Sequence, residues 1–118
     1  MMKTRRIIVI YKRFDIVKLP FPFTDKQSAK VRPALVLSNE DFNRSVGKTI
    51  FAMITSTTKT AWLHDVVLTD FHAAGLTVPS RVRMKIFTID NDFILNQLGH
   101  LSVSDAIEFE KHFAQLTK

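Results

Sequence analysis

Short apolar segments, rich in β-branched and aromatic residues, follow one another along most of the chain, with polar, glycine or proline residues between them. Alternation with period two, or a short buried run of this kind, predicts β-strands. We predict strands over residues 14–19, 33–38, 49–55, 62–69 and 81–89, and a short irregular or strand segment over 93–101. So many short strands favour a small, mainly β barrel, because closing a sheet removes its exposed edges.

A helical pattern closes the chain. Ser102 can cap this helix, with Asp105 three residues later. Its apolar face comprises Ala106, Phe109, Phe113 and Leu116. Only one other helical turn is expected, over residues 39–44, where Asn39 can act as the N-cap and Gly47 ends the segment. Residues 56–60, 70–80 and 90–92 are expected to form loops or turns.

The polar loop PFPFTDKQSAKVRP, residues 20–33, has proline at both ends. Pro20 and Pro22 are expected to stop the first strand, and the phenylalanines beside them to anchor the base of the loop. Arg32 precedes Pro33, which restricts it to extended backbone. We therefore expect Arg32 to be held in a restricted direction where the loop meets the core.

Composition excludes several classes of protein. The 118 residues suit one domain, and 46% apolar content excludes a disordered chain. With no cysteine, neither disulfides nor thiolate sites can form. The apolar run of residues 7–11 is too short for a signal peptide, and no segment approaches the roughly 18 apolar residues of a membrane helix. We expect a soluble protein of the reducing cytoplasm, with no membrane partner.

A net charge of +6 favours a polyanionic partner, either nucleic acid or an acidic protein. Five cations precede the first acid, Asp15. We expect residues 1–13 to be a basic N-terminal extension and residues 14–118 to be a single domain. A solvated tail, an upstream start codon and a binding role all remain open for the extension.

Most familiar catalytic signatures are absent. Three scattered glycines cannot build a phosphate-binding loop, and no GxSxG motif occurs. The four histidines show neither HxxH nor HExxH spacing, and the Asp90-Asn91-Asp92 run is more typical of a turn than of a cation site. We expect no metal site, with His112 at the surface and His64 either structural or facing a cleft.

Two strand ends offer a better site. If the strands over 33–38 and 49–55 pair antiparallel, Arg32 and Thr55 lie on one rim of the barrel. A guanidinium beside a hydroxyl can bind the oxygens of a phosphodiester. A surface ion pair for Arg32 and an ordinary strand end for Thr55 are the alternative.

A basic stripe offers a second candidate surface. Arg81, Arg83 and Lys85 alternate with apolar residues and should share one face of a strand, where they could follow a nucleic-acid backbone together with Arg32 and Lys30. A solvated sheet face explains the same pattern.

The run FDIVKLPFPFTDKQSAKVRPALVLS resembles the opening of the PemK/MazF family of toxins from bacterial toxin–antitoxin pairs. There an Asp-Ile-Val strand and a variable loop precede Arg-Pro and an apolar strand ending in Ser. AMITST and AGLTVPSRVRMKIFTI resemble later blocks of that family, in the same order, and QLGHLS with the final helix completes the resemblance over residues 14–117.

The resemblance implies an SH3-like barrel of the CcdB/MazF type, usually a homodimer, which cleaves single-stranded RNA at preferred sequences without a metal or other cofactor and is silenced by a cognate antitoxin. Arg32 and Thr55 match the family's catalytic arginine and threonine, and Ser56 would be a second donor. The RNA's own 2′-OH would attack the adjacent phosphorus, leaving a 2′,3′-cyclic phosphate and a 5′-OH. Residues 24–31 would form a lid beside the RNA, with Thr24 and Lys30 among the contacts.

The chain departs from the family pattern at two places. Phe14 replaces the glycine that commonly precedes the Asp-Ile-Val strand, and Ser80 stands where some members have an acid, which leaves the general base unassigned. Two alternatives therefore remain: a toxin of the same fold that inhibits by binding a protein such as DNA gyrase, and a catalytically inactive barrel that binds RNA or antitoxin.

Overall fold

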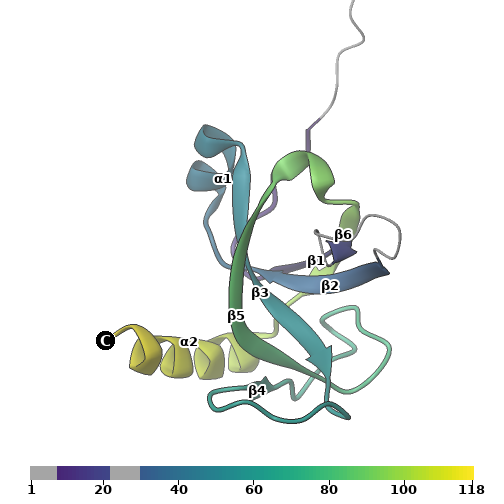
Figure 1. The fold of residues 1–118 in the computed structure, drawn as a ribbon, viewed down its shortest axis with the longest axis vertical. Helices are drawn as coiled ribbons and strands as arrows, with labels where there is room; N and C mark the ends of the chain where they lie inside the picture. Colours follow the sequence, from purple (N-terminus) through teal and green to yellow (C-terminus); the bar gives the residue numbers. More distant parts are fainter. Residues whose placement is uncertain (1–7, 22–29) are drawn as a thin grey trace, which may run out of the picture.

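The computed structural model describes residues 8–21 and 30–118, which form one antiparallel sheet and flanking helices (Figure 1). The elements in chain order are β1 (Asp15–Phe21), β2 (Lys30–Val36), α1 (Glu40–Val46), β3 (Lys48–Ser56), β4 (Val66–Val67), β5 (Ser80–Asp90), the 3-10 helix η1 (Asn91–Phe93), β6 (Asn96–His100) and α2 (Val103–Thr117). The six strands are ordered β4-β5-β3-β2-β1-β6. The predicted mainly β, barrel-like fold with a C-terminal helix is confirmed, as a strongly curled half-barrel.

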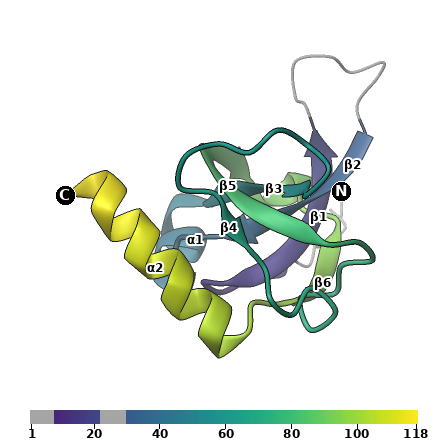
Figure 2. The same cartoon turned by 90° about the horizontal axis from the view of Figure 1, so that it is seen from below.

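Both faces of the central strands are buried. Ile16, Leu35 and Ala52 pack with Phe109 of α2 in one core, while Val17, Ala34 and Phe51 belong to a second core on the other side. Two covered faces explain why PALVL is a continuous apolar run rather than an alternating one. Figure 2 shows α2 lying beside β4, where it covers the first core.

The curl has a local cause in β5. Ala52 pairs with Ile86, but the next residue of β3, Met53, pairs with Arg83, so Met84 and Lys85 are extra residues in β5. An irregularity of this kind bends the strand and increases its twist.

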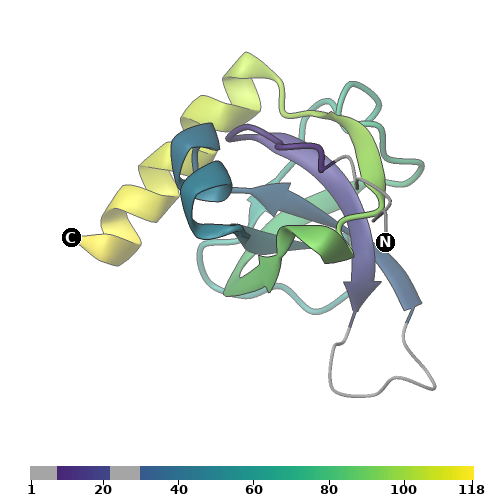
Figure 3. The same ribbon diagram turned by 90° about the horizontal axis from the view of Figure 1, so that it is seen from above.

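Buried polar side chains fix the connections. Asp105 accepts hydrogen bonds from the backbone N–H and the Oγ1 of Thr69, at 3.1 and 2.8 Å, and so ties α2 to the segment after β4. At the opposite end, Asn91 donates to the carbonyl of Asn43 at 2.8 Å and joins η1 to α1. Figures 1 and 3 show these two helices at the same end of the sheet.

The helix caps follow the predictions. The Asn39 side chain accepts from the N–H of Phe42 at 2.9 Å, and Gly47 ends α1 with a left-handed φ of 78°. Ser102 accepts from the N–H of Asp105 at 3.2 Å. Leu116, at the end of the predicted apolar face of α2, is 47% exposed, because the last turns of the helix extend beyond the sheet (Figure 2).

Several strand predictions differ from the structure at their ends, and β2 begins three residues before the strand predicted over 33–38. Pro20 does not stop the first strand, because β6 pairs with β1 only as far as Lys18 and, among the described residues, no second strand pairs with Pro20. The strand predicted over 62–69 shrinks to β4, because Asp65 accepts from the N–H of Trp62 at 2.9 Å and closes a local turn.

The turn that carries Gly75 is pressed against β6. Gly75 has a φ of 78°, and a Cβ built on it would lie 2.0 Å from the carbonyl oxygen of Leu98. Only glycine readily adopts this positive φ and also leaves room for the Leu98 carbonyl, because it has no Cβ. No helix among the described residues is long and apolar enough to cross a membrane.

Candidate active site

Arg32 and Thr55 are brought together where β2 and β3 separate. The two strands pair antiparallel, as predicted, and their ladder ends at Ala34–Met53. Continuing this register by two residues places Arg32 (34 − 2) opposite Thr55 (53 + 2). Pro33 has no amide hydrogen to donate, so an end of the ladder at this point is expected. β2 begins at Lys30, so Arg32 extends from a strand rather than from the loop before it.

A cavity of about 220 Å³ opens at this separation. Arg32, Thr55 and Ser56 all line it, with Lys59 from the loop that follows β3. Arg32 is exposed, and none of the described residues forms an ion pair with its guanidinium. Guanidinium, ammonium and hydroxyl groups around one cavity form a receptor for a phosphate group.

The other walls of the cavity are apolar or neutral: they comprise Pro33, Ile54, Leu76, Thr77, Val78 and Ser80. The hydroxyl of Ser80 donates to the carbonyl of Val78 at 2.8 Å, and the hydroxyl of Ser56 accepts from the N–H of Thr58 at 3.0 Å. Among the described lining residues none is a carboxylate or an imidazole. The site therefore offers positive charge and hydrogen-bond donors, and its described walls hold no general base.

Sequence reasoning missed Lys59. It lies in a polar run that reads as a connection between strands, and only the path of the chain brings it back to the cavity. The only available signal was its position four residues after Thr55. Of the other predicted RNA contacts, Lys30 is exposed at the start of β2, two residues before Arg32, while Thr24 lies outside the described residues.

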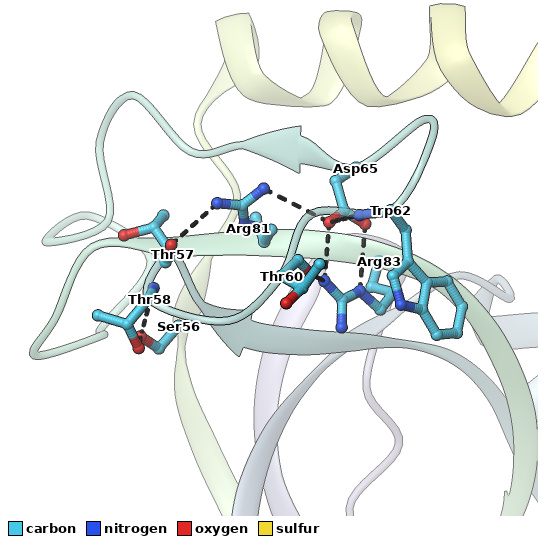
Figure 4. Close-up of polar contacts among 8 residues, drawn as sticks. All are labelled: Ser56, Thr57, Thr58, Thr60, Trp62, Asp65, Arg81 and Arg83. Atoms are coloured by element: carbon cyan, nitrogen blue, oxygen red, sulfur yellow. Dashed lines mark hydrogen bonds and ion pairs between the residues drawn. The ribbon is translucent and has the colours of Figure 1, made fainter.

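Arg81 and Arg83 lie on one face of β5, opposite Thr55 and Met53 of β3, but both are covered by the β3–β4 loop, residues 57–65. Arg83 binds the Asp65 carboxylate through Nε and Nη2, at 3.3 and 2.9 Å, and Arg81 lies 3.5 Å from the same carboxylate (Figure 4). The side chains are only 8%, 12% and 3% exposed for Arg83, Arg81 and Asp65 respectively. The predicted basic stripe is thus largely engaged within the protein, and only Lys85, in the irregular part of β5, is exposed.

Both arginines also donate to loop carbonyls. Arg81 Nη2 reaches the carbonyl of Thr57 at 3.0 Å, and Arg83 Nη2 reaches that of Thr60 at 2.5 Å. Burial alone raises the pKa of Asp65, but the hydrogen bonds from Arg83 and the Trp62 N–H, with the charges of both arginines, outweigh it and hold the pKa below its usual value. Asp65 is therefore ionised at neutral pH and fixes the loop to β5.

The histidines and the Asp90–Asp92 turn have structural surroundings. Within residues 8–21 and 30–118, no group of three or more histidine or acidic side chains is arranged to hold a metal ion. Asn91 of that turn is buried, and its side chain accepts from Thr49 Oγ1 at 2.7 Å. His112 is half-buried rather than at the surface, because its Nδ1 lies 3.4 Å from Nδ1 of His64.

Several solved structures have the same fold as this chain. The chain superimposes on MazF in a MazE–MazF complex from Deinococcus radiodurans, with a TM-score of 0.74 and 21% identity over 92% of this chain and 97% of that one. An endoribonuclease solved with its cognate antitoxin, from a mycobacterial species, gives a TM-score of 0.70 and 15% identity over 89% and 92% of the two chains. A MazF toxin of Mycobacterium tuberculosis gives a TM-score of 0.69 and 22% identity over 86% of this chain and 93% of that one.

A comparison with curated protein sequences finds no significant match. The family model of the PemK-like, MazF-like toxins of type II toxin–antitoxin systems matches residues 12–117, nearly the whole chain. The chain therefore belongs to this toxin family.

Proposed function

We propose that this toxin is a sequence-selective endoribonuclease that cleaves single-stranded RNA without a metal ion. The observation that carries the proposal is the cavity shared by Arg32, Thr55 and Lys59, which presents two cations and a hydroxyl donor to one space. The family to which the chain belongs supports the same reading. A barrel that inhibits only by binding a protein such as DNA gyrase has no need for this combination of groups.

The reaction uses the 2′-OH of the RNA as its nucleophile. As the 2′-oxygen bonds to the adjacent phosphorus and the bond to the 5′-oxygen breaks, negative charge develops on the non-bridging oxygens. Arg32 binds two of these oxygens through its planar fork, and Thr55 donates to the same group. Lys59 adds a second positive charge, with Ser56 beside it. A water molecule takes the 2′-proton and the leaving 5′-oxygen takes a proton from the solvent, so the products are a 2′,3′-cyclic phosphate and a 5′-OH end.

Charge stabilisation supplies most of the catalysis in this scheme. The described walls hold no carboxylate or imidazole to take the 2′-proton. Preorganised donors directed at developing charge are the largest contributors in many enzymes. DNA lacks the 2′-OH, so single-stranded DNA of the same sequence should bind without being cut.

We also propose an antitoxin partner and a homodimeric assembly. Relatives of the same fold have been solved as MazE–MazF and endoribonuclease–antitoxin complexes. The net charge of +6 and the basic cavity favour an acidic antitoxin segment that competes with RNA.

The test is cleavage of single-stranded RNA by the purified protein in EDTA. We expect cyclic-phosphate and 5′-OH products from the wild type, and a roughly 100- to 1,000-fold lower rate for Arg32→Ala, since one oxyanion donor is worth that much. Arg44→Ala is the matched control. Arg44 is exposed on α1, so this substitution removes the same charge at a position away from the cavity. Intact RNA in wild-type reactions both with and without EDTA would refute the proposal, whereas cleavage that occurs without EDTA and is lost on chelation would refute its metal independence.

A further inference from the structure

Trp62, the single tryptophan of the chain, is 48% exposed although its position is fixed on several sides. The guanidinium carbon of Arg83 lies 4.6 Å from the centre of its ring, which is cation–π geometry. The backbone N–H of Trp62, not its ring N–H, donates to Asp65, and Asp65 in turn binds Arg83. One face of the indole is therefore supported from within the protein, while much of the residue stays open to solvent (Figure 4).

The support under Trp62 is rigid. Asp65 and Arg83 are joined by two hydrogen bonds, and Arg83 also holds the carbonyl of Thr60. A side chain fixed in this way loses little conformational freedom when a ligand binds, so the platform is preorganised.

Trp62 lies in the same β3–β4 loop as Lys59, one of the residues that line the candidate active site. Lys59 lines the cavity, and the chain from Lys59 to Trp62 can span at most about 11 Å. Arg83, beneath the indole, pairs with Met53, two residues along β3 from Thr55. Ser56 and Trp62 lie at opposite ends of the cluster in Figure 4.

The charges around Trp62 favour a nucleic acid over an apolar protein segment. The loop and the strand beneath it contribute Lys59, Arg81 and Arg83 against one carboxylate, Asp65. Single-stranded RNA is bound by just this combination of positive charge and aromatic faces, on which unpaired bases stack.

We propose that Trp62 is a stacking platform for one unpaired base of the RNA, on a nucleotide that flanks the cleaved phosphate. This inference rests on the proposed function and adds a binding residue to it. Arg83 and Asp65 act as positioning residues, because they hold the indole rather than the RNA. The basic stripe thus contributes to RNA binding indirectly, through the loop that it fixes.

The first test uses the fluorescence of this single tryptophan. A mixed-sequence 2′-O-methyl RNA oligonucleotide, which cannot be cleaved by 2′-OH attack, is titrated into the wild-type protein. Stacking on Trp62 should quench its emission in step with binding measured by anisotropy of a labelled RNA. Unchanged emission at saturation would overturn the proposal. No RNA binding would overturn it too, and a quench by an acidic peptide but not by RNA would assign the surface to a protein partner.

The second test separates stacking from a structural role. We expect Trp62→Ala to weaken RNA binding by about 5- to 150-fold and Trp62→Phe to restore much of the affinity. Phe93→Ala, which removes a 55% exposed aromatic ring from η1, should bind as the wild type does. The RNA sequence that binds most tightly is then made with a single abasic nucleotide at each position in turn. At one position the missing base should weaken RNA binding by the wild type by a similar factor and leave RNA binding by Trp62→Ala unchanged.

The outcomes separate this inference from the proposed function. If RNA is cleaved in EDTA but no abasic position is coupled to Trp62, the stacking proposal is refuted and the endoribonuclease proposal is supported. If the tryptophan emission is quenched in a way that depends on one base, but ordinary RNA is not cleaved, the stacking proposal is supported and the endoribonuclease proposal is refuted.

Discussion

At the scale of single residues, Pro33 has two effects on the site. It restricts Arg32 to extended backbone, which strand β2 requires. It also coincides with the end of the ladder between β2 and β3, where the cavity opens. Arg32 therefore lies at a fixed point of the sheet and not on a loop, which suits a group that must meet developing charge.

Replacing Thr55 tests the second donor. Thr55→Val removes the hydroxyl while keeping a shape that suits a strand, so we expect a roughly 100-fold or larger loss in single-turnover cleavage with little change in thermal unfolding. Thr88→Val, at an exposed position of β5, is the control. Wild-type rates for Thr55→Val would show that the hydroxyl does not take part.

Strand order is what made the proximity of Arg32 and Thr55 predictable from sequence, whereas their proposed role came from the family resemblance. Both flank apolar runs, and antiparallel neighbours bring the start of one strand to the end of the next. Lys59 was not predictable, because its position depends on a loop fixed by Asp65, far along the chain from the arginines that bind it. For the same reason Arg81 and Arg83 looked like solvent-facing phosphate contacts: period two identifies a shared face but not what covers it.

At the scale of elements, the β3–β4 loop is held by charge more than by apolar packing. Asp65, Arg81 and Arg83 link it to β5 through five contacts, three to the carboxylate of Asp65 and two to loop carbonyls. The turn closed by Asp65 also replaced the strand expected over 62–69, since a local side-chain hydrogen bond prevailed over the β propensity of Trp62 and its neighbours.

Acid should weaken this loop. The pKa of Asp65 is lower in the folded protein than in the unfolded chain, so its stabilisation is complete above the unfolded value of about 3.9 and is lost as pH falls through the folded value. We expect Asp65→Asn to lower the free energy of unfolding by about 3–5 kcal/mol at pH 7, as for other broken buried pairs. Urea unfolding between about pH 3 and pH 7 should show this difference shrinking below about pH 4.

Asp41→Asn is the matched control, because Asp41 is exposed in the first turn of α1. Its unfolding free energy should follow that of the wild type across the pH range. A difference between wild type and Asp65→Asn that stays constant down to about pH 3 would contradict a lowered pKa.

At the scale of the whole molecule, the sequence predicted a small sheet of five or six strands and the terminal helix but not how far the sheet curls. Curling depends on the two extra residues in β5 and on the approach of Gly75 to Leu98. Neither leaves a periodic signal, because each is a contact between distant parts of the chain. The double core was equally hidden, although the unbroken apolar run of β2 is consistent with it.

The net charge of +6 predicts strongly salt-dependent RNA binding. The logarithm of the affinity for 2′-O-methyl RNA should fall linearly with the logarithm of salt concentration, with a slope of about −0.7 for each phosphate neutralised. Arg32→Ala should make this slope shallower by about 0.7, whereas Trp62→Ala should lower affinity with little change of slope. Equal slopes for wild type and Arg32→Ala would show that Arg32 does not bind a phosphate.

The cluster beneath the β3–β4 loop has a consequence for divergence. One carboxylate, Asp65, serves two arginines, so a neutral replacement of Asp65 leaves two buried guanidinium groups without their acidic partner, whereas replacing one arginine leaves the other paired. A lineage that loses Asp65 must change both arginines almost together with it, or pass through poorly folded intermediates. Among descendants of this chain we expect Asp65, Arg81 and Arg83 to be kept or lost as a set, while the exposed residues of the same loop vary independently and alter which RNA sequences are bound.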